Sequence, residues 1–315
     1  MATGPLIRIE DPATALPSLT WREKLERLEH WLSAFRSVIV AYSGGVDSSV
    51  LLRVAHGVLG ARALGVIGRS ESYAPRELEL ALDQAASFGA RVEVVTTGEL
   101  ADQSFRSNSP ARCYHCKSEL YRKLVDLARR ENATILDGTI ADDAGDWRPG
   151  RRAADEHDVR SPLAELGFTK ADVRQAARFY GLTSQDKPAS PCLASRIPYG
   201  TEITKEILSM VDRAEELLRS LGFRELRVRH HGDVARLEVP AAELARAIDP
   251  AIRERLVQGL KALGYRYVAL DLEGFRSGSL NRVLDAKRKA PRTRASRPGR
   301  KRQGTLKKSG TTSRA

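Results

Sequence analysis

Short apolar runs alternate with amphipathic segments through the first half of this 315-residue sequence, and that alternation limits the folds open to it. Strands are expected at residues 37–42 and over "ALGVIG", "RVEVVTT" and "ATILDG". Helices are expected at 21–35, directly after "SGGVDSS", at 75–88 and at 113–131, where apolar residues recur with helical spacing. This order predicts an α/β fold, a doubly wound parallel sheet whose ligands bind beyond the carboxyl ends of the strands.

The chain is longer than a single hydrophobic core usually supports, so more than one domain is expected. Past Gly200 the pattern changes to a helix, two short strands joined by a tight "HHGD" turn, two further helices and a last strand, "YRYVALDL". We expect four parts: a leader (1–20), a nucleotide-binding domain (21–199), a smaller α+β domain (200–285) and a tail (286–315).

The formal net charge of +12 is concentrated at one end of the chain. Residues 286–315 contain twelve Lys or Arg and no Asp or Glu, which leaves forty basic and forty acidic residues in the rest. This tail has almost no large apolar side chain to bury, so we expect it to be disordered. It is expected either to make weak contact with nucleic acid or to be a solubilising extension without a dedicated partner.

Nothing in the sequence predicts contact with a membrane. A run of about 18 apolar residues, as a membrane-spanning helix requires, is absent. The first twenty residues also lack the basic start and apolar block of an export signal. The sequence therefore predicts a soluble, cytoplasmic protein.

The segment "SGGVDSS" lies on a predicted strand-to-helix turn and is suited to binding phosphate. It lacks the lysine of a P-loop, so an ordinary P-loop is excluded. Gly44 and Gly45 allow the backbone to close on an anion, and the following helix offers free amides and the positive end of its dipole. Asp47 adds a carboxylate suited to a magnesium ion that bridges phosphates. Three hydroxyl groups complete the set: Ser43, Ser48 and Ser49.

All three cysteines fall in two stretches, "RCYHCKSEL" and "SPCLASRIPYG". An odd number of cysteines without an export signal argues against a disulfide framework and for metal-binding or catalytic thiols. Cys113 and Cys116 have the Cys-x-x-Cys spacing of metal sites, whereas Cys192 stands alone downstream. The alternative is that the three are small buried apolar side chains.

The glycine-rich loop resembles that of the PP-loop ATP pyrophosphatases, which split ATP into AMP and pyrophosphate while they adenylate a substrate. "ILDGTIADD" is similar to the second nucleotide-binding segment of that superfamily. The resemblance implies an adenine nucleotide alpha-hydrolase-like fold, with Gly138 and Thr139 near ATP. It makes Asp142 or Asp143 a further acidic residue of the site, with helix capping as the alternative.

Four longer strings together are similar to the LarE sulfurtransferases of nickel-pincer nucleotide biosynthesis: "RCYHCKSEL", "DWRPGRRAADEHDVRSPLAE", "KPASPCLASRIPYGTEIT" and "DLEGFRSGSLN". The resemblance spans residues 21–284. It implies that ATP adenylates a carboxylate of pyridinium-3,5-biscarboxylic acid mononucleotide and that sulfur then displaces AMP to give a thiocarboxylate. Two rounds give the bisthiocarboxylate that later holds nickel. The resemblance also implies a homo-oligomer.

The resemblance gives the cysteines a role in that reaction. Cys192 is the expected sulfur position, and Arg196 is expected to contact phosphate or the activated carboxylate. In some members a single cysteine here gives up its sulfur and becomes dehydroalanine. In others three cysteines hold a [4Fe–4S] cluster whose open iron carries extra sulfide, and Cys113, Cys116 and Cys192 match that pattern. Zinc, completed by His115 or water, and a transient disulfide are the alternatives.

Arg227 and Arg229 alternate in a predicted strand and therefore face the same side. Paired guanidinium groups bind phosphate well, so we expect them to hold the phosphate of the mononucleotide. An exposed basic strand face is the alternative. For Glu215 and Glu216 the resemblance suggests an acidic residue near the site, whereas the helical pattern alone predicts a solvated face.

Two other functions fit part of the sequence. A tRNA thiolase of the PP-loop type also pairs ATP with three cysteines and a cluster, and the basic tail would suit RNA. Against it, the body of the chain has no basic surplus and "PCLASRIPYG" matches LarE better. A non-catalytic iron–sulfur regulator that binds nucleic acid is the second alternative, and the complete loop with Ser43, Asp47 and Ser48 argues against it.

Overall fold

A computed structural model describes residues 19–145, 149–188 and 191–276 of the chain. The predicted disorder of the basic tail and nearly all of the expected leader lie outside the described residues. Within the described part, no helix is both long and apolar enough to cross a membrane.

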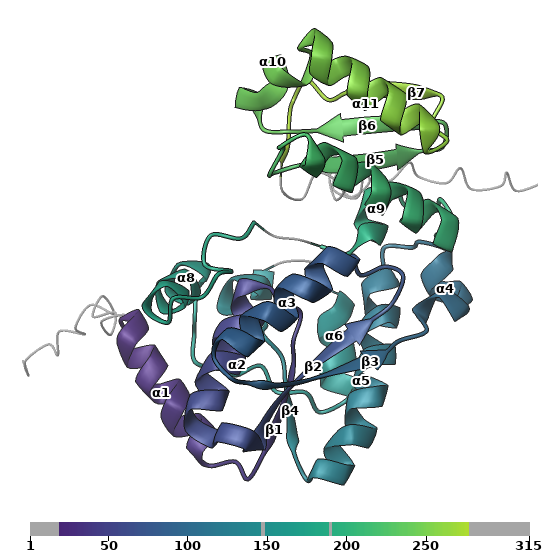
Figure 1. Ribbon diagram of the computed structural model, residues 1–315. Coiled ribbons are helices and arrows are strands. Elements are labelled where there is room, and N and C mark those ends of the chain that lie inside the picture. The colour runs from purple at the N-terminus through teal and green to yellow at the C-terminus, as the bar shows by residue number, and fades with distance from the viewer. Residues whose placement is uncertain (1–18, 146–148, 189–190, 277–315) are drawn as a thin grey trace, which may run out of the picture. The chain divides into compact units, whose positions relative to one another are not determined.

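Four parallel strands form the first sheet, in the order β3–β2–β1–β4 (Figure 1). Their bounds are β1 Val38–Ala41, β2 Ala63–Arg69, β3 Arg91–Thr96 and β4 Thr134–Leu136. In the centre, Val38 of β1 lies opposite Ala63 on one side and Thr134 on the other. The chain moves outward from β1 to β3 and then returns across β1 to β4, which confirms the predicted doubly wound sheet. In sheets of this kind ligands bind beyond the carboxyl ends of the two strands at the reversal, which here are β1 and β4.

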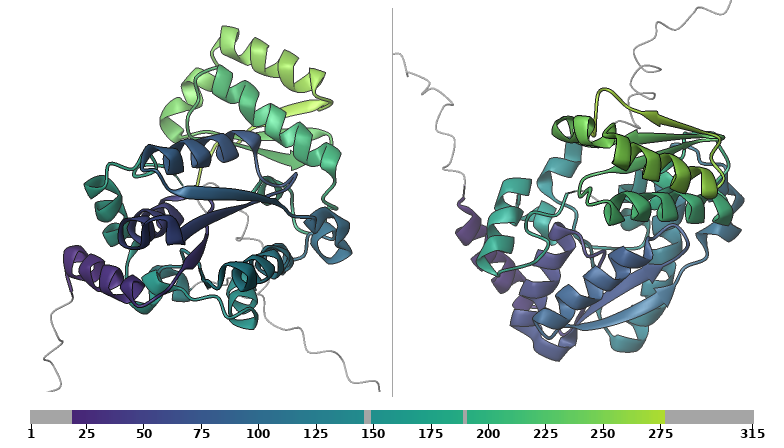
Figure 2. Two further views of the ribbon diagram at one scale, coloured as in Figure 1. Left: turned by 60° about the horizontal axis from the view of Figure 1, so that its bottom comes forward. Right: turned by 45° about the horizontal axis from the view of Figure 1, so that its top comes forward.

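Helices cover both faces of this sheet (Figure 2). One face carries α1 Trp21–Ser33, α2 Val46–Leu59, α3 Pro75–Ser87 and α8 Lys170–Phe179. The other carries α5 Arg112–Glu131 and α6 Pro149–Glu156. Val38 and Val40 of β1 pack into the first apolar core, and Ile39 packs into the second. Because β1 is buried on both faces, its sequence is continuously apolar.

Local sequence determines where several helices begin. Thr20 precedes α1 and Thr169 precedes α8, and each forms a capping box with an acidic residue three positions later. Pro75 occupies the first turn of α3, where its missing amide hydrogen costs nothing. The pattern of apolar residues does not predict α6, α8 or two four-residue helices, α4 Gln103–Arg106 and α7 Pro162–Glu165.

A second sheet has the order β5–β6–β7 and consists of β5 Arg227–His231, β6 Val234–Glu238 and β7 Tyr267–Leu270. β5 and β6 are antiparallel and meet at Gly232, whose φ of 62° suits a tight hairpin, and β6 and β7 are parallel. Helices α9 Lys205–Ser220 and α11 Pro250–Ala262 complete its apolar core. This is the predicted α+β order, except that the first of the two later helices is only four residues long, α10 Leu244–Ala247. The domain boundaries stay predictions.

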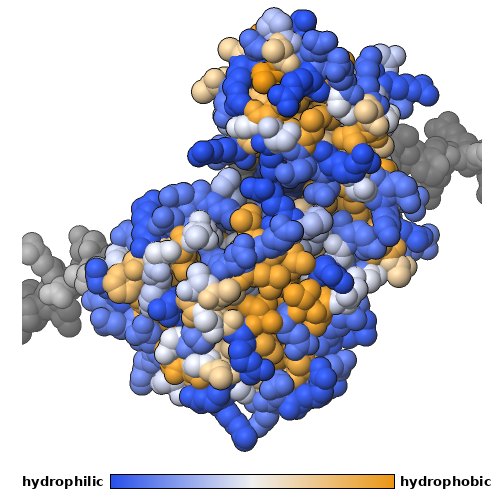
Figure 3. All heavy atoms as spheres, in the orientation of Figure 1, coloured by the Kyte–Doolittle hydropathy of each residue, from blue (hydrophilic) through white to orange (hydrophobic). Residues whose placement is uncertain are grey.

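Apolar side chains gather on the surface beside α3 and the edge strand β3 (Figure 3). Leu80, Leu82 and Val94 are between 36% and 41% exposed there. Exposed apolar patches are typical of surfaces that contact other protein chains. The expected homo-oligomer stays a prediction.

Candidate functional site

The glycine-rich loop follows β1 and leads directly into α2, as predicted. Gly44 has a φ of 65°, and a Cβ there would lie 2.5 Å from the Cβ of Ala81, so glycine is required on both grounds. Ser48 Oγ accepts from the backbone N–H of Ser43 and donates to the carbonyl of Gly45, both at 3.2 Å. These bonds fix the loop and present the first amides of α2 to an anion.

Gly138 brings the segment after β4 against this loop. A Cβ at Gly138 would lie 2.7 Å from the backbone nitrogen of Ser48 and 2.9 Å from its Cα, so only a glycine allows this approach. The two predicted nucleotide segments, 94 residues apart at Gly44 and Gly138, therefore meet at the carboxyl end of the sheet. Their contact with ATP stays a prediction.

Asp137 organises the segment after β4 and was missed in the sequence, although it lies directly between that strand and Gly138. It is 4% exposed and accepts from the backbone and hydroxyl of Thr139 at 3.1 and 2.8 Å and from Ser161 Oγ at 2.7 Å. Burial opposes its ionisation, but the charge of Lys117 and these hydrogen bonds outweigh burial and hold the pKa of Asp137 below its usual value. Thr139 is therefore held in place by a buried carboxylate.

The two aspartates that follow each accept a hydrogen bond from a backbone N–H. Asp142 accepts from the backbone N–H of Lys170 at 2.8 Å and so caps the start of α8. Asp143 is 7% exposed and accepts from the backbone N–H of Ile140 at 3.2 Å. These contacts favour the capping alternative for Asp142.

Lys170 of α8 is a second residue of the site that sequence reasoning missed. Its ammonium lies 2.8 Å from both carboxylate oxygens of Asp47, in the first turn of α2. The two residues are 123 positions apart, so no local pattern connects them. The Lys170 ammonium neutralises the Asp47 carboxylate, and the magnesium role of Asp47 stays a prediction.

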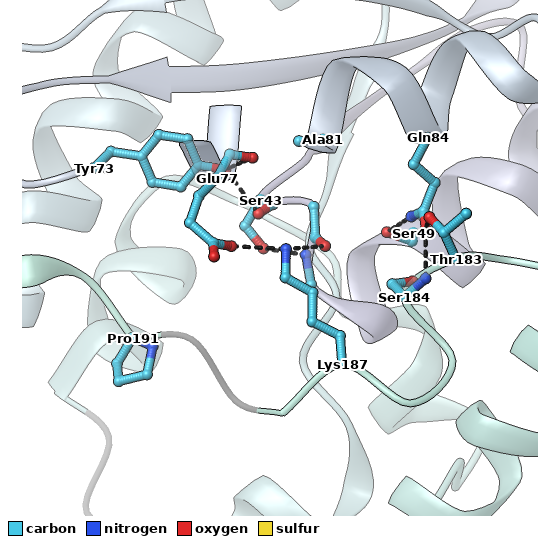
Figure 4. A network of polar contacts seen from close by, with 12 residues as sticks. Ser43, Ser49, Tyr73, Glu77, Ala81, Gln84, Thr183, Ser184, Lys187 and Pro191 are labelled. Atoms are coloured by element: carbon cyan, nitrogen blue, oxygen red, sulfur yellow. Dashed lines mark hydrogen bonds and ion pairs between the residues drawn. The ribbon is translucent and has the colours of Figure 1, made fainter. Parts of the chain in front are cut away.

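Lys187 connects the loop with the segment that leads to Cys192 (Figure 4). Its ammonium pairs with Glu77 Oε2 at 2.7 Å and donates to the carbonyl of Gly44 at 3.4 Å. The hydroxyl of Tyr73 donates to the carbonyl of Ser43 at 2.9 Å. Tyr73 and Glu77, which contact Ser43 and Lys187, also line a small cavity of about 10 Å³ together with Cys192. The loop and the predicted sulfur position thus have common neighbours.

The two cysteine segments come together although Cys192 is far from Cys113 and Cys116 in sequence. Cys113 and Cys116 lie in the first turns of α5, and Cys192 directly precedes a short 3-10 helix, Leu193–Arg196. Cys116 and Cys192 pack against one apolar cluster. Burial raises the pKa of the Cys116 thiol, and negative charge on Glu99 and on the other two cysteines raises it further. Burial also raises the pKa of Cys192, and Cys113 adds to this rise.

The described residues contain no group of three or more His, Cys, Asp or Glu side chains arranged to hold one metal ion. His115 instead pairs with Asp102, its Nδ1 lying 3.4 Å from Oδ2. This arrangement does not support the zinc alternative. A four-iron cluster separates its three thiolates more widely than a single metal ion does, so the absence of a single-ion site among the described residues does not exclude a cluster. The cluster assignment stays a prediction.

Two buried polar residues, Asn108 and Arg112, join the two cysteine segments. Arg112 Nη1 donates to Asn108 Oδ1 at 2.5 Å and to the carbonyl of Ala194 at 3.0 Å. The side-chain amide of Asn108 donates to two carbonyls of the segment 194–198, at 3.2 and 2.8 Å. Because Arg112 directly precedes Cys113 and Ala194 follows Cys192 by two residues, these bonds set the position of the two thiols relative to each other.

Arg196 is the last residue of the 3-10 helix that follows Cys192, and it is 2% exposed. It donates to both oxygens of Glu215, at 2.8 and 3.0 Å, and to the carbonyls of Pro191 and Cys192. Glu215 is 1% exposed, so the solvated face that the helical pattern predicts is wrong for Glu215 and right for Glu216, whose side chain is 54% exposed. The positive charge of Arg196 also opposes the rise in the pKa of Cys192.

Changing Glu215 to Gln is expected to lower the free energy of unfolding by about 3 kcal/mol, because it leaves the buried charge of Arg196 uncompensated. Burial opposes ionisation of Glu215, but Arg196 and its neighbours hold its pKa below the usual value. The stability that the ionised Glu215 contributes is therefore fully present above the pKa of this carboxyl in the unfolded chain, about 4.3. It is lost as the pH falls through the lower pKa of Glu215 in the folded protein.

Denaturant unfolding at neutral pH measures this effect, with Glu216→Gln as the matched control on the same helix. The control removes an exposed pair with Arg219 and is expected to change stability by less than about 0.5 kcal/mol. Equal losses of stability in the two variants would contradict the assignment of Glu215 as the buried partner of Arg196.

Arg227 and Arg229 are each 7% exposed, so the exposed basic face considered as an alternative is wrong. Arg229 donates to both oxygens of Glu238, at 3.0 and 2.8 Å, and to the carbonyl of Ser195 at 2.9 Å. The Arg227 guanidinium lies 5.0 Å from the centre of the Phe275 ring. Burial lowers the pKa of Arg227 to about 10, and the charge of nearby Arg196 adds to this. Their phosphate role stays a prediction.

The chain was also compared with known proteins. No protein-family model matches it. It is 41% identical over 255 residues to the pyridinium-3,5-bisthiocarboxylic acid mononucleotide synthase of Lactiplantibacillus plantarum, covering 80% of this chain and 92% of that protein. It is 45% identical over 262 residues to an uncharacterized protein of Synechocystis, covering 83% and 98%. An uncharacterized protein of Methanocaldococcus jannaschii is 28% identical over 243 residues, covering 77% and 92%.

The parallel sheet and the loop at its switch point define a nucleotide-binding protein of the PP-loop class. The identity to the L. plantarum synthase, which extends over most of both chains, assigns this protein to one family within that class. The chain belongs to the LarE family of sulfurtransferases.

Proposed function

We propose that this protein is an ATP-dependent sulfurtransferase that acts on pyridinium-3,5-biscarboxylic acid mononucleotide. ATP adenylates a carboxylate of the substrate and releases pyrophosphate, and sulfur then displaces AMP to form the thiocarboxylate. Family membership supports this reaction. The observation that carries it is that the glycine-rich loop and Cys192 have Tyr73 as a common neighbour: its hydroxyl donates to Ser43 of the loop, and the residue lines the same small cavity as Cys192.

The loop residues bind and orient the phosphates of ATP in this proposal. The first amides of α2 and the Ser48 hydroxyl would contact an anion bound at Gly44 and Gly45. Thr139, whose hydroxyl donates to the buried carboxylate of Asp137, follows Gly138 in the adjoining segment. Asp47 would hold the magnesium ion in place of the Lys170 ammonium that its carboxylate contacts in this structure. When bound, the ion neutralises phosphate charge.

The cysteines provide the sulfur site. We propose that Cys113, Cys116 and Cys192 hold a [4Fe–4S] cluster, because Asn108 and Arg112 fix the two cysteine segments together. Such a cluster, bound by three thiolates, has one iron free to carry sulfide.

We propose that the substrate phosphate binds near Arg227 and Arg229, with Arg196 holding the cysteine segment against them. Arg229 donates to the carbonyl of Ser195, so the second sheet and the cysteine segment are in direct contact. Glu238 already accepts two bonds from Arg229, and a bound phosphate would compete with it for this guanidinium.

Changing Asp47 to Asn is expected to slow adenylation by about a hundredfold or more, because the magnesium ion loses its anionic ligand. Formation of AMP and pyrophosphate from ATP in the presence of the mononucleotide measures this step. Asp142→Asn is the matched control, since Asp142 caps α8 and is expected to leave the rate within a few-fold. ADP as the main product would contradict the proposed reaction.

A further inference from the structure

A groove of about 680 Å³ lies between the start of α1 and the exposed face of α8, which lie side by side (Figures 1 and 2). Trp21 and Arg22 form one wall. Lys170, Arg174 and Arg178 recur at every fourth position and therefore line the other wall from one face of α8. The groove has the volume of a small-molecule site, and four cations line it.

Arg22 is held in its wall by stacking on two aromatic rings. Its guanidinium carbon lies 4.6 Å from the centre of the Trp21 ring and 5.3 Å from that of Phe179. The two rings contact each other with centroids 5.8 Å apart. This cation–π stacking orients the charge of Arg22, which has no carboxylate partner within the part of the chain that the structure describes.

The positive charge of the groove is only partly neutralised. Within the described residues, Arg22 and Arg174 have no ion-pair partner, while Arg178 lies 3.5 Å from Asp186 and Lys170 pairs with Asp47. A site with this surplus is suited to a small anion that carries several charges.

Lys170 belongs to both the groove and the nucleotide site. Its ammonium contacts Asp47 in the first turn of α2, and its side chain also lines the groove. An anion at this end of the groove competes with Asp47 for the same ammonium. The groove therefore begins where the phosphates of ATP are expected to lie.

We propose that this groove is a second phosphate site, which binds pyrophosphate beside the glycine-rich loop and receives it after adenylation. Four cations match the several negative charges of pyrophosphate. A nucleotide fits less well, because Arg22 already covers the faces of Trp21 and Phe179 on which a base would stack. The source of the pyrophosphate rests on the proposed function, but the site itself rests on the charges of the groove.

Trp21 serves as a local reporter for the test. The chain has three tryptophans, so a Trp31→Phe/Trp147→Phe background leaves Trp21 alone. Titration of this full-length protein with pyrophosphate, without ATP or magnesium, is expected to give a saturable change in fluorescence. Adding Arg174→Gln/Arg178→Gln should raise the half-saturating concentration by about tenfold or more.

The matched control is Arg129→Gln/Arg130→Gln, which removes the same charge from the exposed end of α5 and should leave the titration unchanged. Ser48→Ala alters the glycine-rich loop but not the groove, so the fluorescence of Trp21 should still change when pyrophosphate is added to this variant. Equilibrium dialysis with labelled pyrophosphate is the second measurement, and the Arg174→Gln/Arg178→Gln protein must bind fewer equivalents than the control.

Three results would overturn the proposal: an unchanged affinity in Arg174→Gln/Arg178→Gln, loss of the response in Ser48→Ala, or an equal response to AMP. All of these measurements are made without turnover. A failure of the groove to bind pyrophosphate is therefore distinct from a failure of the proposed reaction. The second would appear as the absence of AMP and pyrophosphate formation from ATP.

Discussion

Serine in place of Cys113 or Cys116 is expected to abolish sulfur transfer and to leave pyrophosphate formation largely intact. A cluster that carries sulfide needs three protein thiolates, so loss of any one removes it. The glycine-rich loop has its own hydrogen bonds and does not depend on the thiols. Thiocarboxylate formation, measured by mass spectrometry, and pyrophosphate release, measured on the same samples, separate the two steps.

Two further variants make this result specific. Cys192→Ala should abolish transfer whether Cys192 is a cluster ligand or gives up its own sulfur. His115→Ala is the matched control, because His115 lies between the two cysteines but pairs with Asp102, and it should retain transfer. Loss of transfer in His115→Ala would instead favour zinc.

The sacrificial mechanism gives a different pattern. If Cys192 donates its own sulfur, the Cys113→Ser and Cys116→Ser proteins complete one turnover, and Cys192 loses the mass of one sulfur and two hydrogens. Iron and acid-labile sulfide content of anaerobically purified protein provides an independent measurement. Absence of both from protein that still transfers sulfur would disprove the cluster.

Gly138→Ala is expected to reduce adenylation by about a hundredfold, because the added Cβ displaces the first turn of α2 and with it the phosphate-binding amides. The Cβ would lie 2.7 Å from the backbone nitrogen of Ser48, and a helix backbone cannot move aside as a flexible side chain can. Rates of AMP and pyrophosphate formation measure the loss.

Gly98→Ala is the matched control for this prediction. Gly98 has a φ of −116°, and an added Cβ meets nothing within 4 Å, so an alanine there should be neutral. Thermal unfolding of both variants shows whether the fold is kept. A Gly138→Ala protein with nearly normal adenylation would show that the segment after β4 does not support the nucleotide site.

The first sheet and the place of its candidate site could be predicted from the sequence alone. Strand and helix periods, capping residues such as Thr20 and the glycines of "SGGVDSS" act over a few neighbouring residues, so they can be read locally. The parallel order then brings Gly44 and Gly138 to one edge, since the carboxyl ends of parallel strands lie together.

The sequence could not predict which charged residues are buried or with which partner, because long-range contacts determine both. Lys170 meets Asp47 across 123 residues, and Arg112 reaches Ala194 across 82. Helical spacing could not distinguish Glu215 from Glu216, because a solvated face and a buried ion pair have the same local pattern. A charged side chain is buried only when a partner compensates its lost hydration, and that partner comes from a distant part of the chain.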